Sequence, residues 1–122
     1  MDFSGIVADM KKAPDFAKNA GMILIHNGTV RAWSRENRLS VTELEVVSDN
    51  DKIELLRSEY EKKPGIYRII IQAASGNLKP GDDLLLIVVA GDIRENVIPV
   101  MSELLDRIKA ECVRKKEKYL NE

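Results

Sequence analysis

The chain lacks several residue types on which common protein classes depend. It contains one cysteine, Cys112, so it cannot form an internal disulfide, which suits a reducing cytosol. It also contains one histidine, His26, with no cysteine or carboxylate at metal-ligand spacing from it. We therefore interpret His26 as a structural residue and Cys112 as a packed thiol, and we expect no metal site.

The sequence also lacks a strong net charge and a long apolar run. Charged residues make up 32% but nearly cancel to a net charge of −1, and aromatic residues make up 5%. Both values argue against nucleic-acid binding, even through the basic segment Arg114 to Lys116. The longest apolar run, Leu84 to Ala90, is far shorter than the ~20 residues of a membrane helix, and the N-terminus has no apolar signal core. The sequence thus predicts a soluble, cytoplasmic protein that binds neither nucleic acid nor membrane.

The elements that are present predict a single domain over residues 1–122, long enough to bury one core. One or two short helices are expected within residues 1–19. Ser48, with Asp51 three residues later, predicts the start of another helix, which Pro64 and Gly65 end. Segments rich in β-branched or apolar residues predict strands at 22–33 (with a bulge or close approach at Gly28), 41–47, 66–72 and 84–90.

The segment 92–118 predicts a long amphipathic helix on which the rest of the domain packs. Its apolar residues recur at three-four spacing: Val97, Val100, Met101, Leu104, Leu105, Ile108, Cys112 and Val113. Asp92 is a candidate N-cap, but Pro99 tolerates only the first turn of a helix, so Asn96 is an alternative. The helix is therefore expected to start between Ile93 and Val97.

The order of these elements predicts the fold class. Helices and strands do not alternate strictly, as they would in a parallel α/β sheet. The strand at 84–90 is apolar on both faces and is expected at the centre of its sheet. We predict an α+β domain with a mainly antiparallel sheet and flanking helices.

Three cations along the long helix suggest an anion site. On one continuous helix, Lys109 and Lys116 would lie on nearly the same face about 10 Å apart, close enough to flank one anion. Arg94 and Lys109 would instead lie roughly 22 Å apart along a straight helix, too far to hold one small molecule. If all three serve one site, a second copy of the chain must complete it.

These cations also have a purely structural interpretation. Lys109 and Lys116 would interact favourably with the C-terminal end of the helix dipole. Arg31, at the end of the strand predicted at 22–33, could pair with Glu43 or Glu45 on a neighbouring strand.

Short motifs between residues 20 and 117 are weak one by one, but their order and spacing carry a resemblance. They are Gly21-Met22-Ile23-Leu24 with Gly28-Thr29-Val30-Arg31, then Leu78-Lys79-Pro80-Gly81-Asp82, then Val88-Val89-Ala90 with Arg94, and Asp106-Arg107-Ile108-Lys109 with Lys116-Glu117. Together they resemble the large, catalytic subunit of molybdopterin synthase, the MoaE-like family. The resemblance implies the fold of that subunit, an α/β hammerhead.

The resemblance also implies an activity. The family is a sulfurtransferase of molybdenum cofactor biosynthesis that converts a cyclic pyranopterin monophosphate, its substrate, into the dithiolene molybdopterin without a bound cofactor. A ubiquitin-like small subunit carries the sulfur as a C-terminal Gly-Gly thiocarboxylate. The large subunit is expected to form a homodimer and, with small subunits, a heterotetramer.

The matching motif positions imply roles for four residues. Lys109 and Lys116 are expected to be catalytic, and Arg31 and Arg94 are expected to bind substrate, because arginine keeps its charge at any relevant pH. Lys115 is an alternative second lysine, since Lys115-Lys116-Glu117 can correspond to the Lys-Lys-Glu of the family.

Several positions depart from the family pattern. Ile93 replaces the histidine that precedes the arginine, and Ala73-Ala74 replaces a His-Arg pair. Val113 to Lys115 replace an aromatic residue and a proline between the two lysines. These departures raise a second hypothesis, in which activity is lost. The chain would then be a non-catalytic relative that binds a pterin, another anion or a ubiquitin-like tail.

Overall fold

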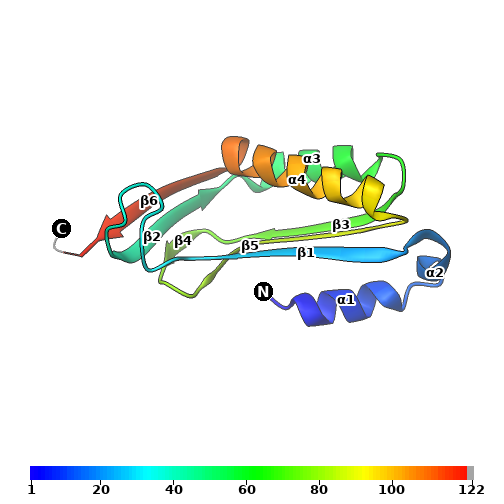
Figure 1. The fold of residues 1–122 in the computed structure, drawn as a ribbon, viewed down its shortest axis with the longest axis horizontal. Helices are drawn as coiled ribbons and strands as arrows, with labels where there is room; N and C mark the ends of the chain where they lie inside the picture. The colour runs from blue at the N-terminus through cyan, green and yellow to red at the C-terminus, as the bar shows by residue number, and fades with distance from the viewer. Residues whose placement is uncertain (121–122) are drawn as a thin grey trace.

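The computed structural model describes residues 1–120 and arranges them as two antiparallel three-stranded sheets with helices (Figure 1). The first sheet has the order β1 (Met22–Thr29), β5 (Asp83–Gly91), β3 (Ile66–Ala73). The second has the order β4 (Gly76–Leu78), β2 (Val41–Ser48), β6 (Val113–Tyr119). The helices are α1 (Phe3–Lys11), α2 (Phe16–Asn19), α3 (Asn50–Glu61) and α4 (Arg94–Glu111). The predicted α+β class with antiparallel sheets and flanking helices is confirmed.

Strand β5 is the centre of the first sheet, as its apolar run predicted. Its residues from Leu85 to Ala90 are almost completely buried, and they alternate between two cores. Leu85, Ile87 and Val89 pack against the face covered by α3 and α4. Leu86, Val88 and Ala90 pack against the face covered by α1. A strand covered on both sides needs apolar residues at every position, which explains the unbroken run.

Helices α3 and α4 lie side by side on one face of the first sheet, and α1 lies on the other (Figure 1). Helix α3 begins one residue later than the sequence suggested. Asp49, not Ser48, is its N-cap, and the Asp49 carboxylate accepts a hydrogen bond from the backbone N–H of Lys52. Ser48 instead ends β2, and its hydroxyl donates to the carbonyl of Ala74.

Helix α4 begins at Arg94, within the expected range, but neither proposed residue caps it. Ile93 occupies the N-cap position without a side-chain hydrogen bond. The Asp92 carboxylate accepts from the backbone N–H of Ile93 and from the side-chain amide of Asn96. Pro99 lies inside the helix, beyond the first turn where it was expected.

The predicted extension of α4 to Lys118 is wrong. The helix ends at Glu111, and Val113–Tyr119 forms β6, which pairs with β2 over most of its length. The helical spacing of apolar residues runs on into Cys112 and Val113, so the local pattern does not mark the end. The end is set by backbone pairing with a strand some 70 residues earlier in the chain.

The short strand β4 was also missed, because Gly76 to Leu78 is too short to show an alternating pattern. The bulge expected near Gly28 is present, between Gly28 and Thr29. Within residues 1–120, no helix combines the length and the apolar composition that crossing a membrane requires.

Candidate functional site

A cavity of about 820 Å³ opens where the end of α4 and strand β6 meet β1 and the loop that follows it. Its volume falls in the range of ~300–1,000 Å³ that is typical of small-ligand pockets. Part of the wall is apolar and comes from Val30, Val41, Leu44, Leu84, Leu85 and Val113. The remaining wall is mostly polar and has more basic than acidic side chains, so the cavity combines a surface for a ring system with groups that attract anions.

Five cationic side chains line this cavity: Arg31, Arg35, Lys109, Lys115 and Lys116. Two carboxylates, Glu36 and Glu117, also belong to the lining. Among residues 1–120, none of the five cations forms a salt bridge, although exposed cations elsewhere on the molecule do. A concentration of unpaired positive charge beside an apolar wall is suited to an anionic ligand.

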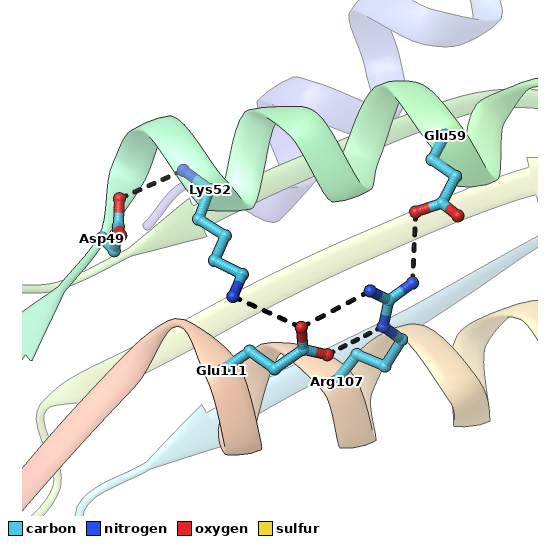
Figure 2. Close-up of polar contacts among 5 residues, drawn as sticks. All are labelled: Asp49, Lys52, Glu59, Arg107 and Glu111. Carbon is cyan, nitrogen blue, oxygen red and sulfur yellow. Dashed lines mark hydrogen bonds and ion pairs between the residues drawn. The ribbon is translucent and has the colours of Figure 1, made fainter.

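Lys109 reaches the cavity from the last turn of α4, and contacts with α3 hold that turn in place. The carboxylate of Glu111 accepts from Arg107 at 2.8 Å and lies 3.4 Å from the Lys52 ammonium (Figure 2). Arg107 also donates to Glu59 on α3 at 3.1 Å (Figure 2). This network ties α4 to α3 and thereby fixes the position from which Lys109 projects.

The β2–β6 register separates the two adjacent lysines. Lys115 lies opposite Val46, which is 1% exposed, whereas Lys116 lies opposite Glu45, which is exposed. Directly opposed residues of an antiparallel pair point to the same face of the sheet. Lys115 therefore projects from the inner face, toward the apolar wall, and Lys116 from the outer face. The helical arrangement expected for Lys109 and Lys116 is wrong, although both residues do border the cavity.

The charges that line the cavity act on one another electrostatically. Lys115 is exposed as a whole residue, but partial burial lowers the pKa of its ammonium group, and the charges of Lys109 and Arg31 lower this pKa further. Glu117 acts in the opposite direction. Burial, and then the charge of Lys109, also lowers the pKa of His26. His26 was interpreted as structural, but its half-buried ring borders the same cavity.

The carboxylate of Glu117 is held by neighbours. It accepts a hydrogen bond from the hydroxyl of Ser34 at 3.0 Å and from the hydroxyl of Tyr119 at 3.4 Å. Ser34 is completely buried, so this bond ties the loop after β1 to β6. The two segments that carry Arg31 and Lys115 are thereby fixed relative to each other.

Arg31 does not pair with either glutamate suggested by the sequence. Glu43 lies 3.9 Å from the ammonium of Lys118, and no salt bridge within residues 1–120 includes Arg31. The guanidinium of Arg31 instead lies 4.9 Å from the centre of the Trp33 ring. Sequence reasoning missed Trp33, and it also missed Arg35, because a loop carries no periodicity from which side-chain direction can be read.

Arg94 lies outside the cavity, at the opposite end of α4. Its side chain is 80% exposed and pairs with Glu95 at 3.1 Å. Ile93, where the family pattern has histidine, is beside it and 51% exposed. Ala73 and Ala74 lie at the other end of the first sheet, where the backbone N–H of Ala74 donates to the carbonyl of Leu84, a cavity residue.

The remaining candidate groups have no place in this site. Cys112, the C-cap residue of α4, is buried in the core, and burial raises the pKa of its thiol, as expected of a packed cysteine. In the part of the chain that the structure describes, no group of three or more His, Cys, Asp or Glu side chains could hold a metal ion.

Comparisons with known proteins agree with this architecture. Molybdopterin synthase from Staphylococcus aureus is 24% identical, with a TM-score of 0.72 over 84% of this chain and 77% of that one. The molybdopterin cofactor biosynthesis protein E from Burkholderia multivorans is 22% identical, with a TM-score of 0.72 over 98% of this chain and 84% of that one. The complex of subunits 1 and 2 of the molybdopterin-converting factor from Helicobacter pylori is 18% identical, with a TM-score of 0.70 over 100% of this chain and 86% of the matched one. No curated protein matches the chain.

A family model adds what these distant structures cannot show. The model of the MoaE protein family matches residues 3–111, which is most of the chain and includes Arg31, Arg94 and Lys109. The match ends before β6, so it does not include Lys115 and Lys116. The extent of the match and the shared fold lead to one conclusion: the chain belongs to the MoaE family of molybdopterin synthase large subunits.

Proposed function

We propose that this chain is the large subunit of a molybdopterin synthase. In this proposal it transfers sulfur from a thiocarboxylated, ubiquitin-like small subunit to cyclic pyranopterin monophosphate. Family membership supports a role in molybdenum cofactor biosynthesis. The observation that carries the finer proposal is the cavity lined by five cations, none of which forms a salt bridge within residues 1–120.

The charge of the reactants explains why such a cavity suits this reaction. The substrate carries a phosphate and the sulfur donor carries a thiocarboxylate, so the two reactants repel each other. Fixed cations offset this repulsion, and they also stabilise negative charge that develops in the transition state. Cations already engaged by protein carboxylates would do this less well.

The residues divide into two roles. Lys109 is proposed as the catalytic lysine, and Arg31 as a phosphate ligand whose charge does not depend on pH. For the second lysine, the β2–β6 register favours Lys115 over Lys116, since Lys115 shares the inner face of the sheet with the buried Val46. The coupling of Lys115 to both Lys109 and Arg31 supports the same choice.

The size of the cavity leaves room for a protein partner. About 820 Å³ is near the upper end of the small-ligand range, so an extended peptide tail can enter beside a pterin. The Helicobacter pylori structure is a complex of two subunits of a molybdopterin-converting factor, which supports a small-subunit partner for this chain as well.

Arg94 can serve the site only from another chain. Helix α4 separates it from Lys109 by 15 residues, or roughly 22 Å if the helix is straight. In a two-fold dimer, one protomer's Arg94 can lie beside its partner's Lys109, and symmetry then produces two equivalent sites. We therefore include a homodimer, and with small subunits a heterotetramer, in the proposal.

The decisive experiment is reconstitution. The purified chain is mixed with a thiocarboxylated ubiquitin-like subunit and cyclic pyranopterin monophosphate, and dithiolene product is measured. The control is the same small subunit with an ordinary C-terminal carboxylate, which binds but carries no sulfur. Product in the first mixture and none in the control is the expected result; no product in either, with both proteins folded, would refute the proposed activity.

A non-catalytic binding protein is the second candidate, and two observations favour it. Ala73 and Ala74, which replace a His-Arg pair, lie next to the cavity residues Leu84 and Leu85. Ile93 replaces a histidine beside Arg94. Calorimetry and the dithiolene assay together distinguish the two candidates, because a non-catalytic relative would bind the pterin or the small subunit at micromolar concentration but form no dithiolene.

A further inference from the structure

The cavity arginine Arg31 is held by an aromatic ring in place of a carboxylate. Its guanidinium carbon lies 4.9 Å from the centre of the Trp33 ring, a distance typical of a cation–π contact. Trp33 is 41% exposed and lies outside the cavity lining, whereas Arg31 belongs to that lining. The ring is therefore positioned to act on the cavity through Arg31.

Arg31 needs such support because its surroundings repel it. Arg31, Lys109 and Lys115 line the same cavity, and the charges of Arg31 and Lys109 both lower the pKa of Lys115. A carboxylate partner would hold Arg31 in place, but it would also occupy N–H donors and compete with an anionic ligand. An aromatic face attracts the guanidinium while leaving its N–H edge free to donate.

The loop that carries Trp33 is fixed by its own hydrogen bonds. Trp33 forms an isolated antiparallel bridge with Ser40, and the N–H of Ser34 donates to the carbonyl of Leu39 at 2.9 Å. The buried Ser34 hydroxyl also donates to Glu117 on β6. These contacts hold the backbone from which the ring projects, independently of Arg31.

We propose that Trp33 is a positioning residue that holds the guanidinium of Arg31 at the cavity wall, ready to bind the phosphate of the substrate. This inference rests on the proposed function, because it assigns Arg31 to phosphate binding. A second arginine, Arg38, also lies near the Trp33 ring, at 4.6 Å from its centre, but it does not line the cavity. Arg38 therefore provides a matched control at the same ring.

The test measures binding of inorganic pyrophosphate, used as the probe anion, by calorimetry at low salt. Trp33→Leu should raise the Kd about fivefold, the upper end of what an exposed cation–π contact contributes. Trp33→Phe keeps an aromatic face and should stay within about twofold of the unmodified chain. Arg38→Gln should also stay within about twofold, and Arg31→Ala should raise the Kd at least as much as Trp33→Leu.

Fluorescence gives an independent readout, because Trp33 is the chain's single tryptophan. Pyrophosphate should change the indole emission in the unmodified chain and not in Arg31→Ala. Circular dichroism melts confirm that each variant is folded. Unchanged affinity in Trp33→Leu, with affinity lost in Arg31→Ala, would overturn the positioning role alone. Unchanged affinity in both variants would overturn the phosphate-binding role of Arg31 as well, and with it that part of the proposed function.

Discussion

At the scale of single residues, the charge of Lys109 acts on two other groups that line the cavity. It contributes to the lowered pKa of His26 and to the lowered pKa of Lys115, two groups on different strands. It is itself exposed and projects from the end of a helix whose buried face consists of other residues. Its removal should therefore change the chemistry of the cavity far more than the stability of the fold.

We predict that Lys109→Ala abolishes most sulfur transfer. Loss of one preorganised charge at the reacting centre typically lowers kcat by about 10²–10³. Dithiolene formation measures the rate, and the thermal melt should match that of the unmodified chain. Lys62→Ala, an exposed lysine at the end of α3 remote from the cavity lining, is the control. An unchanged rate in Lys109→Ala would contradict the assignment.

The same variant should raise the pKa of His26. Burial is the larger cause of the lowered value and the charge of Lys109 the smaller one, so the pKa should rise without reaching 6.5. The sign for stability follows from proton binding. Between the lowered folded pKa and 6.5 the unfolded chain binds more protons, so His26 makes the free energy of unfolding increase with pH in that window.

A proton NMR titration measures this pKa directly, because the chain has one histidine. In Lys109→Ala, the pH range over which His26 makes the free energy of unfolding increase should become narrower. Urea unfolding at several pH values between 5 and 7 measures this range. A His26 pKa that does not move in this variant would show that the two side chains are not close in solution.

The two adjacent lysines should differ in anion binding. Lys115→Ala is expected to weaken pyrophosphate binding several-fold, because Lys115 projects from the inner face of its sheet, while Lys116→Ala should be milder. Because its pKa is lowered, Lys115 loses its proton and its charge at a lower pH than an ordinary lysine, whose pKa is 10.5. As the pH rises, pyrophosphate binding should therefore begin to weaken before the pH reaches that value. Calorimetry over a pH series tests both statements, and a larger effect in Lys116→Ala would reverse the assignment.

At the scale of elements, a backbone hydrogen bond at each end of α4 joins segments that are far apart in the chain. At its C-terminal end, the backbone N–H of Asp49 donates to the carbonyl of Cys112, which joins the start of α3 to the turn between α4 and β6. At its N-terminal end, the N–H of Asp92 donates to the carbonyl of Gly65, which joins the end of β5 to the turn before β3. These two contacts attach both ends of α4 to neighbouring segments of the chain.

We predict that Gly91→Ala strongly destabilises the fold. A Cβ at this position would lie 2.5 Å from the carbonyl oxygen of Gly65 and 2.6 Å from a methyl of the buried Val97. Such overpacking typically costs about 1–3 kcal/mol. Urea unfolding measures the loss, with Ser102→Ala on the exposed side of α4 as control. Equal stability of the two variants would mean that the β5–α4 junction can expand.

At the scale of the whole molecule, one chain separates residues that the proposed reaction needs together. The cavity lies at one end of the first sheet, and Arg94 lies at the other end of α4. Arg94 also places a positive charge at the positive end of a helix dipole, a position more favourable when an anion is near. A dimer that brings Arg94 to the cavity of a second chain would place it near Lys109 and near an anionic substrate.

Complementation tests this arrangement. Arg94→Ala and Lys109→Ala should each lose activity as homodimers, because each removes a group from both shared sites. Mixed dimers should regain part of the activity, since one of their two sites has both groups intact. Sulfur transfer is measured after subunit exchange, which mass spectrometry can follow. A chain that stays monomeric at micromolar concentration, or exchanged dimers without any recovery, would exclude Arg94 from the lysine site.

Local pattern was enough to predict most elements of this protein. The apolar run from Leu84 to Ala90 predicted a central strand, since a strand covered on both faces needs apolar residues throughout. The β-branched segments predicted β1, β2 and β3, and the order of elements predicted the α+β class. The motif that contains Lys109 and the one that contains Arg31 also identified two residues that do meet in the cavity.

Tertiary structure decided what followed Glu111. The helical spacing continues into Cys112 and Val113, so sequence alone extended α4 to Lys118, but pairing with β2 satisfies the backbone of Val113–Tyr119 as a strand. That pairing decided which adjacent lysine projects inward, because alternate residues of a strand point to opposite faces. The pairing of β1 with β5 likewise places His26 at the cavity, for which the sequence had no signal. The sequence determined the elements through local periodicity, whereas the site depends on contacts between segments far apart in the chain, which periodicity does not encode.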